Sequence, residues 1–469
     1  MKYTKFFVYI FPVMMLMSLI GCIEDGFTSS PSDQPFFSTD TLDMGLVYTD
    51  EPTATHRFVV YNPCSKGIMI SSVEISGRDA GLLRLNVDGM SGRDFSDVEI
   101  RANDSIFVFV SADIPESGCV EPIPMEAQLD FHVNGMVQSV IVVAAGQDIR
   151  RLKGCILNDD TVMEDGIPYQ IKDSLVVAEN ATLTLKAGTR LLFHDGARFI
   201  VRGSLISQGT PESPVILTGD RTGNVITDVS FDLMSRQWFG IDFMEESTAN
   251  RMEYTDVSNT SYGVSVYGDG ISVDSPRLTL VNSRLRNSGD YVLSAVGASV
   301  HAYGCEFSDA ASGLVFLLGG THRFDQCTAA NYYLFSAIRN AAWTVVDPYN
   351  TNLEEYEDYL PTRALITNTI TYGLGADVSE GDLAGWDVFF NNCLFRSKGE
   401  DDDNFINSLW DSDPLYYTVR EDYVFDYRLQ PESPAIGAAD PGLSEYPLDV
   451  DFYGVKRASD LGAYTFVAP

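Results

Sequence analysis

The sequence predicts an all-β protein in which a β-sandwich is followed by a long β-solenoid. Asn282-Ser283, Gly304-Cys305 and Gln326-Cys327 are spaced 22 residues apart, because 304 − 282 and 326 − 304 are both 22. Three-residue apolar runs separated by Gly, Asn, Asp and Pro precede this repeat, and about seven strand-like runs occupy residues 36–147. A fixed period near this length, made of short β-type runs, is typical of a solenoid in which each repeat is one coil.

The first segment has the features of an export signal. Lys2 and Lys5 introduce an apolar stretch from Phe6 to Ile20, which is about 15 residues long. A transmembrane helix needs about 20 such residues, whereas a shorter stretch after basic residues is typical of a signal peptide. We therefore expect residues 1–21 to be a signal peptide.

The end of this stretch, Leu-Ile-Gly-Cys at 19–22, resembles a bacterial lipobox. The resemblance implies cleavage before Cys22, lipidation of Cys22 and a short tether over residues 22–35. Several acyl chains anchor a protein stably, whereas a single chain binds only marginally. The expected location is the outer membrane, on the periplasmic or the cell-surface side, and the acidic pair Glu24-Asp25 favours the surface. An ordinary signal peptide with an incidental cysteine is the alternative.

The chain is strongly acidic, with a formal net charge of −35. Loss of the two lysines of the signal peptide would bring the charge to about −37. Nucleic acid is therefore a poor partner, and the membrane is expected as a partner only through the lipid.

The region from 36 to 147 predicts an immunoglobulin-like sandwich. Short β-branched or aromatic runs at this spacing, separated by Asn-Pro, Asp-Gly and Asn-Gly turns, fit two packed antiparallel sheets. Cys64 and Cys119 both lie here, and export permits a disulfide between them without requiring one. The expected strands are 56–61, 67–75, 82–87, 97–100, 105–110, 127–133 and 137–144.

Several phrases of this region resemble a known type of domain. Four stretches are similar to the amino-terminal sandwich domain of lipoproteins common in gut Bacteroidota. They are Leu42–Gly45, Phe58–Asn62, Asn103–Val110 and Asn134–Gln138. The resemblance implies a stalk or spacer without an activity of its own.

Residues 148–469 predict the solenoid. Apolar triplets such as Leu183–Leu185 and Leu191–Phe193 have the length of one face of a β-coil and are too short for helices. The stretches Thr184–Thr189, Ile200–Leu205 and Ser213–Gly219 resemble the opening coils of right-handed parallel β-helix proteins of the pectin-lyase-like superfamily. The resemblance implies that equivalent residues of successive coils lie above one another.

Extending the 22-residue register predicts a column of small side chains at a tight corner of the coil. The residue before each member is often Asn, which suits a left-handed or hydrogen-bonded turn. Three members are cysteines, for which a packed ladder is favoured over metal or redox chemistry. The expected column is Thr255, Ser283, Cys305, Cys327, Thr369 and Cys393.

The two ends of a parallel coil expose strand edges and need covers. Three stretches near the end of the sequence resemble the carboxyl-terminal segment that ends many bacterial β-helix proteins. They are Ser433–Gly437, Asp449–Asp451 and Asp460–Tyr464. We expect this capping segment to close the last coil.

The sequence offers no recognisable lyase or hydrolase motif, so no catalytic residue is assigned. Hydrolases of the superfamily carry a Gly-His-Gly, which this chain lacks. Lyases of the superfamily need clustered acids, calcium and a basic residue. One acidic run is a candidate for metal binding, and it consists of Glu400, Asp401, Asp402 and Asp403. Its spacing does not follow a calcium-loop pattern. We interpret this acidic run as a solvated loop and expect no cofactor. The alternative is that the run binds calcium.

Aromatic residues crowd the distal third of the chain, many of them between coils. Exposed Tyr and Trp beside Asp and Asn form a platform for sugar rings, whereas packing beneath the loops is the simpler interpretation. The residues considered for glycan binding are Trp343, Tyr349, Tyr356, Tyr359, Trp386 and Trp410.

These observations favour a lipid-anchored envelope protein that displays a β-helix for polysaccharide binding or adhesion, without catalysis. The first alternative is a polysaccharide lyase or glycoside hydrolase of the superfamily, and the second is a structural component of an envelope complex. An enzyme requires acids and a base converging within about 5 to 10 Å in one groove. A binding protein requires exposed aromatic rings, and a scaffold requires neither.

Overall fold

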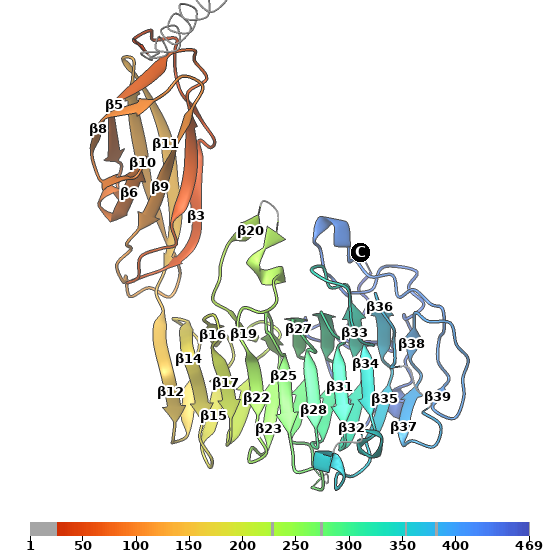
Figure 1. Ribbon diagram of the computed structural model, residues 1–469. Helices are drawn as coiled ribbons and strands as arrows, with labels where there is room; N and C mark the ends of the chain where they lie inside the picture. The colour runs from red at the N-terminus through yellow and green to blue at the C-terminus, as the bar shows by residue number, and fades with distance from the viewer. Residues whose placement is uncertain (1–25, 227–228, 273–274, 352–353, 380–382, 469) are drawn as a thin grey trace, which may run out of the picture. The chain divides into compact units, whose positions relative to one another are not determined.

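The computed structural model describes residues 26–226, 229–272, 275–351, 354–379 and 383–468. The chain forms two compact units, Met1–Asp148 and Ile149–Pro469. Across these described ranges the secondary structure consists of β-strands and short 3-10 helices, without an α-helix (Figure 1). The prediction of an all-β chain is therefore confirmed. None of the helices in the described ranges is long and apolar enough to cross a membrane. Cys22 lies outside the described residues.

Unit 1 contains two β-sheets that share one hydrophobic core. The alternation of buried and exposed residues along the strands, for example in β9, explains why both sheets can pack against the same core. A short 3-10 helix, η1 (Ala80–Leu82), precedes β6. Sheet A consists of β1 (Phe27–Thr28), β3 (Thr41–Tyr48), β5 (Gly67–Ser76), β8 (Phe95–Ile100), β10 (Ile123–Val133) and β11 (Met136–Gln147). Sheet B consists of β2 (Phe36–Phe37), β4 (His56–Tyr61), β6 (Leu83–Val87), β7 (Met90–Gly92) and β9 (Ser105–Ala112).

Sheet B of unit 1 is antiparallel as expected, but sheet A contains parallel pairs, which corrects the sequence-based expectation. β3 pairs with β11 in parallel, and β1 pairs with β5 in parallel. Strands β3 and β11 are far apart in the sequence, so no hairpin forces them to run in opposite directions. The register of β3 shifts near Gly45, whose φ of 69° is a backbone conformation that glycine adopts without strain. The assignment to the immunoglobulin-like class stays a prediction.

Unit 2 contains three stacks of short parallel strands, here called faces 1, 2 and 3, which the chain visits in turn (Figure 1). Face 1 consists of β13 (Thr161–Met163), β15 (Thr182–Lys186), β18 (Ser204–Gln208), β23 (Asn250–Glu253), β26 (Leu278–Val281), β29 (Val300–Tyr303), β32 (Thr321–Asp325), β35 (Arg363–Thr367), β37 (Val388–Asn391) and β39 (Phe405–Ile406). Face 2 begins with the first half of β14 (Tyr169–Val177) and continues through β16 (Arg190–Phe193), β19 (Val215–Gly219), β24 (Thr255–Val257), β27 (Arg284–Ser288), β30 (Glu306–Ala310), β33 (Thr328–Asn331), β36 (Ile370–Gly373) and β38 (Leu394–Phe395).

Face 3 begins with the second half of β14, which is long enough to belong to two faces. Its other strands are β17 (Arg198–Val201), β22 (Gly240–Phe243), β25 (Val264–Tyr267), β28 (Leu293–Val296), β31 (Val315–Leu318) and β34 (Trp343–Val346). β12 (Arg150–Leu157) pairs with β14 before the first complete coil. Elements outside the faces are the hairpin β20 (Asn224–Ile226) and β21 (Val229–Ser230), and the 3-10 helices η2 (Phe231–Leu233), η3 (Pro348–Asn350), η4 (Glu354–Tyr356), η5 (Arg420–Asp422) and η6 (Pro441–Leu443). These long parallel sheets are compatible with the predicted β-helix, whose right-handedness stays a prediction.

The predicted column of small residues is present at the corner between faces 1 and 2. Tyr303 is aligned with Asp325, and Glu306 is aligned with Thr328, so Cys305 must lie next to Cys327 in the adjacent coil. All six predicted members are buried. The residue before each of them has a positive φ, between 41° at Asn282 and 64° at Gly304. Small inward side chains therefore follow left-handed residues at this corner.

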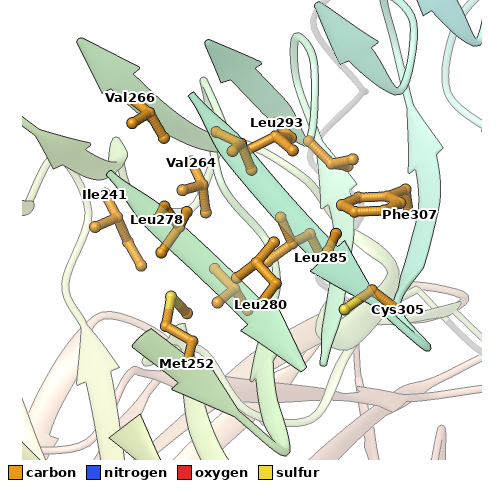
Figure 2. Packing of buried hydrophobic residues seen from close by; sticks show 14 of the residues in the cluster. Ile241, Met252, Val264, Val266, Leu278, Leu280, Leu285, Leu293, Cys305 and Phe307 are labelled. Atoms are coloured by element: carbon orange, nitrogen blue, oxygen red, sulfur yellow. The ribbon is translucent and has the colours of Figure 1, made fainter. Parts of the chain in front are cut away.

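The interior of the coil is filled by apolar side chains from all three faces. Figure 2 shows Ile241 of face 3, Met252 of face 1 and Leu285 of face 2 pointing into the same space. Phe193 and Trp238 stack there with ring centroids 3.9 Å apart. Because each strand packs only against neighbouring coils, the core extends continuously along the stack.

The carboxyl-terminal segment, residues 413–468, runs along the side of the coil at the corner between faces 1 and 2. The Gly462 N–H donates to the Asn368 carbonyl oxygen at 2.9 Å, and the Asn392 side chain donates to the Ala438 carbonyl oxygen at 2.9 Å. The Asn282 side chain, several coils away, donates to the Val450 carbonyl oxygen at 3.0 Å. These contacts place the segment along the side of the stack. The sequence-based expectation was instead a cover over the last coil.

The six cysteines of the described chain are all free thiols. Cys64 and Cys119 are therefore not joined in this structure. Burial raises the pKa of Cys305 and of Cys393 to about 12, so both stay protonated and serve as small packing groups.

Candidate functional site

The outer surface of face 3 carries a row of aligned side chains in successive coils. Asp242 of β22 is paired in register with Ser265 of β25, Ser265 with Ser294 of β28, and Ser294 with Phe316 of β31. Their neighbours along each strand, for example Ile241, point into the core. Alternation along the strands therefore directs this row outwards.

Aromatic rings border this row where the chain enters face 3. Phe239 and Tyr262 are stacked, with ring centroids 5.6 Å apart and an interplanar angle of 21°. Tyr291 lies at the corresponding place in the next coil, and its ring centroid is 5.4 Å from that of Phe316. Tyr267 contributes a further exposed ring from the end of β25. Together with the row, these rings line a hollow of about 390 Å³.

Charged groups are placed at the same surface. The Arg198 guanidinium lies over the Phe239 ring, 4.3 Å from its centroid. Burial raises the pKa of the Asp242 carboxyl above its usual value, while the nearby positive charge of Arg198 acts in the opposite direction. Asp290 is held by Arg339, with an N to O distance of 3.2 Å. The lining thus offers flat apolar rings beside groups that donate and accept hydrogen bonds.

Insertions between coils border face 3 on both sides. On the side where the chain enters face 3, Arg339 also donates to the Ser312 hydroxyl at 2.7 Å, which fixes the 332–341 insertion against the coil. On the opposite side, the 347–362 insertion is attached by the Leu360 N–H, which donates to the Gly270 carbonyl oxygen at 2.8 Å. The Tyr359 ring lies so close to Gly270 that a Cβ at this glycine would be 2.1 Å from the ring.

The six aromatic residues that the sequence suggested for glycan binding do not form one surface. Trp343 is fully buried in the coil core, where its indole N–H donates to the Thr371 hydroxyl at 2.8 Å. Trp386 and Trp410 are partly buried against the same core. The prediction is therefore wrong for Trp343, because its place in β34 points inwards. The tyrosines at 349, 356 and 359 lie in the 347–362 insertion, and Tyr349 is the most exposed of them.

The acidic run suggested for metal binding is used locally. Asp401 accepts a hydrogen bond from the Trp410 indole at 3.1 Å, and Asp402 accepts from the backbone N–H groups of Asn404 and Phe405. Glu400 and Asp403 are exposed at the same turn. In the ranges that the structure describes, no three Asp, Glu, His or Cys side chains gather in a way that could hold a metal ion.

The aromatic residues of face 3 were missed from the sequence, although a signal exists. Phe239, Tyr262 and Tyr291 each stand two residues before the first core residue of a face 3 strand. Their spacings are 23 and 29, since 262 − 239 is 23 and 291 − 262 is 29, so a fixed 22-residue period does not align them. An alignment anchored on the strand starts would have found them.

Comparisons with known proteins do not place this chain in a family. No protein-family model matches it, and no curated protein matches it. Among solved structures, a family 123 glycoside hydrolase from Clostridium perfringens, studied for glycolipid glycan hydrolysis, matches with 8% identity and a TM-score of 0.18. The match covers 24% of this chain and 25% of that enzyme's chain. A similarity at this level carries no argument about fold or function.

Proposed function

We propose that this chain is a lipid-anchored protein of the cell envelope that binds polysaccharide along face 3 without cleaving it. The single observation that carries the proposal is the hollow lined by Phe239, Tyr262, Tyr291 and Phe316 on successive coils. Aromatic faces stack on the apolar faces of sugar rings, while neighbouring polar groups satisfy the hydroxyls. A repeating chain of sugars suits a surface whose rings also repeat from coil to coil.

The envelope location rests on the sequence. The Leu-Ile-Gly-Cys ending at Cys22 supports lipidation, and the acidic residues that follow it support display on the outer membrane surface. In this proposal unit 1 serves as the membrane-proximal spacer, as its resemblance to Bacteroidota lipoproteins suggests. Metabolic labelling with a clickable palmitate, followed by membrane fractionation, tests the anchor. Label that persists in Cys22→Ser would contradict it.

Binding is tested with the full chain in detergent, by affinity electrophoresis through gels that contain a panel of plant and host polysaccharides. We expect retardation by at least one neutral polysaccharide. Loss of one stacked ring costs on the order of 1 kcal/mol, so Phe239→Ala and Tyr262→Ala should each weaken binding about five- to tenfold. Tyr417→Ala, which removes an exposed ring of the carboxyl-terminal segment, is the matched control and should bind as the wild type. Equal retardation of all four proteins would exclude face 3 as the binding surface.

Cleavage of the bound polysaccharide is the second candidate function, and one observation favours it. Asp242 belongs to the lining, at the first end of the row, and its raised pKa is the property of a general acid. Incubation with the retarding polysaccharide, followed by detection of new reducing ends, distinguishes the two functions. If products form with the wild type but not with Asp242→Asn, and both proteins are still retarded, the protein is an enzyme and the non-catalytic proposal is wrong.

A further inference from the structure

The outer surface of sheet B in unit 1 has a second hollow, with a volume of about 590 Å³. It lies over β6, between β7 on one side and β9 on the other, and is lined by Arg84, Asn86 and Phe109 among others. Its volume is within the range of about 300 to 1,000 Å³ that is typical of ligand sites. The spacer role proposed for unit 1 does not account for it.

The side chains beside this hollow are unusual for the outer face of a sheet. In β9, Ile106, Val108 and Val110 point into the core, so the outward positions should be polar by alternation. The outer two, Ser105 and Ser111, are polar, but the central two are Phe107 and Phe109, whose ring centroids are 6.1 Å apart. Phe107 is 41% exposed. Large apolar side chains that gather on a surface where polar ones are expected indicate a contact with another molecule.

Phe36 and Tyr61 extend the aromatic surface on neighbouring strands of sheet B. They are paired in register, and their ring centroids are 6.2 Å apart. Phe36 is 64% exposed and Tyr61 is 42% exposed. The Arg57 guanidinium, on β4 like Tyr61, lies 5.3 Å from the centroid of the Phe107 ring on β9. The outer face of sheet B therefore carries two pairs of rings, Phe36 with Tyr61 and Phe107 with Phe109.

Polar groups complete the hollow on the side of β6. The Arg84 guanidinium and the Asp113 carboxylate form an ion pair at 2.9 Å, with both side chains still accessible at the rim. The Asn86 side chain donates to the Ser91 hydroxyl at 3.0 Å. Arg93 donates to the carbonyl oxygen of Ala80 at 2.6 Å, which ties the rim at β7 to the segment before β6. The rim is thus held by hydrogen bonds on the side opposite the rings.

We propose that this hollow is a second binding site, separate from face 3, and that it takes a neutral oligosaccharide. A sugar hydroxyl both donates and accepts, and the ion pair of Arg84 with Asp113 offers a donor beside an acceptor. The pair has no net charge, Arg93 of the lining is engaged by the carbonyl oxygens of Ala80 and Gly81, and the chain as a whole carries −35, which disfavours an anionic ligand. Phe109, which lines the hollow on the side of β9, supplies the apolar surface for a ring.

Two sites on one chain have a measurable consequence. A polysaccharide long enough to reach both sites binds with avidity, whereas a hexasaccharide reports each site separately. The probe is therefore a panel of neutral hexasaccharides from β-glucan, mannan, xylan and galactan, titrated by calorimetry into the full chain in detergent. Phe239→Ala/Tyr262→Ala removes the stacked pair of face 3 rings, and Asp113→Asn keeps the shape of the rim but removes the charge that holds Arg84.

We expect at least one hexasaccharide to bind the face 3 double variant, and the added Asp113→Asn to weaken that binding at least tenfold. Phe109→Ala, as a second variant, should have a similar effect. Asp97→Asn and Ile141→Ala change exposed residues of sheet A and are the matched controls. Circular dichroism of each variant, unchanged from the wild type, shows that unit 1 is folded.

The outcomes separate this site from the face 3 groove. Complete loss of hexasaccharide binding in the face 3 double variant would overturn the second site and support face 3. Binding that depends on Asp113 and Phe109 and is unaffected by the double variant would support the second site and overturn the face 3 proposal. Binding of no hexasaccharide by the wild type, or residual binding that is unchanged by Asp113→Asn and Phe109→Ala, would overturn the second site.

Discussion

At the residue scale, the corner between faces 1 and 2 shows how one position in each coil satisfies two demands. The inward side chain must be small, and the backbone N–H beside it needs an acceptor. Thr255 donates its N–H to the Ser283 hydroxyl at 3.1 Å, and Cys393 donates to the Ser408 hydroxyl at 3.4 Å. This corner could be predicted because size and turn geometry restrict the choice to a few residue types. Trp343 could not be placed, since a lone Trp suits a core as well as a surface.

Asp309, also in face 2, has its ionisation altered by burial. The Tyr427 hydroxyl lies 2.7 Å from both carboxyl oxygens, and the Tyr332 N–H donates to one of them at 2.9 Å. Burial outweighs these hydrogen bonds and raises the pKa of Asp309 from 3.8 to about 7. A carboxyl whose folded-state pKa is raised contributes stability that is complete below about pH 4 and is lost as the pH rises through 7. A shift of this size corresponds to roughly 4 kcal/mol.

We therefore predict that unit 2 becomes less stable between pH 5 and pH 8, and that Asp309→Asn removes most of this loss. Asn stays neutral over this whole pH range and tolerates the left-handed backbone at this position, where φ is 55°. Urea unfolding followed by intrinsic fluorescence at pH 5, 6, 7 and 8 measures the effect. Asp97→Asn, at an exposed position of unit 1 with a φ of 53°, is the control. Parallel pH profiles for wild type and Asp309→Asn would contradict the prediction.

At the scale of elements, the positions of the strands were easier to predict than the role of their outward side chains. The triplets Leu183–Leu185 and Leu191–Phe193 lie in β15 and β16 as expected, because two inward apolar residues per strand are needed to fill the coil. The start of β3 gave a weaker signal, since Gly45 interrupts its alternation with a bulge. The binding surface proposed for face 3 depends on outward residues, which packing does not restrict. Anchoring on the strand starts would align Tyr262 with Phe239 and Tyr291, but the sequence does not mark these rings as facing the same hollow as Phe316.

The entry to β22 depends on a glycine. Gly240 has a φ of 128°, and a Cβ there would be 2.1 Å from the carbonyl oxygen of Gly263 in the next coil. Both the backbone conformation and the close approach exclude a side chain. We predict that Gly240→Ala destabilises unit 2 by about 3 kcal/mol or more and weakens polysaccharide binding, because Phe239 is the preceding residue.

Gly223 provides the comparison for this substitution. Its φ is 79°, but a Cβ there would meet no atom within 4 Å, so Gly223→Ala should cost only about 1 kcal/mol from the backbone conformation. Chemical denaturation of both variants measures the difference. Equal destabilisation would show that the contact between Gly240 and Gly263 is not the source of the effect.

At the scale of the whole unit, the carboxyl-terminal segment changes what face 2 can carry on its outer surface. Asp256 bridges Arg284 and Arg286, and these groups lie beneath the segment, with the Phe452 ring 4.3 Å from the Arg284 guanidinium. The Tyr464 hydroxyl donates to Glu306. Charges are costly to bury unless each is paired, and here the coils supply the ion pairs while the segment covers them with a ring and a hydroxyl. The segment is thus part of the fold of face 2 and has no counterpart in the lining of face 3.

This arrangement predicts that a chain ending at Ser412 loses structure locally. Without the segment, water reaches the charged groups of face 2, and the apolar side chains of Ile370 and Leu394, which pack against the segment, become exposed. Hydrogen exchange followed by mass spectrometry should show faster exchange in β27, β30 and β33, while β15 and β17, in coils before these contacts, keep their protection. Unchanged protection of β30 would show that the segment only lies on the surface, and equal loss in β15 would show that the coil unfolds as one cooperative body.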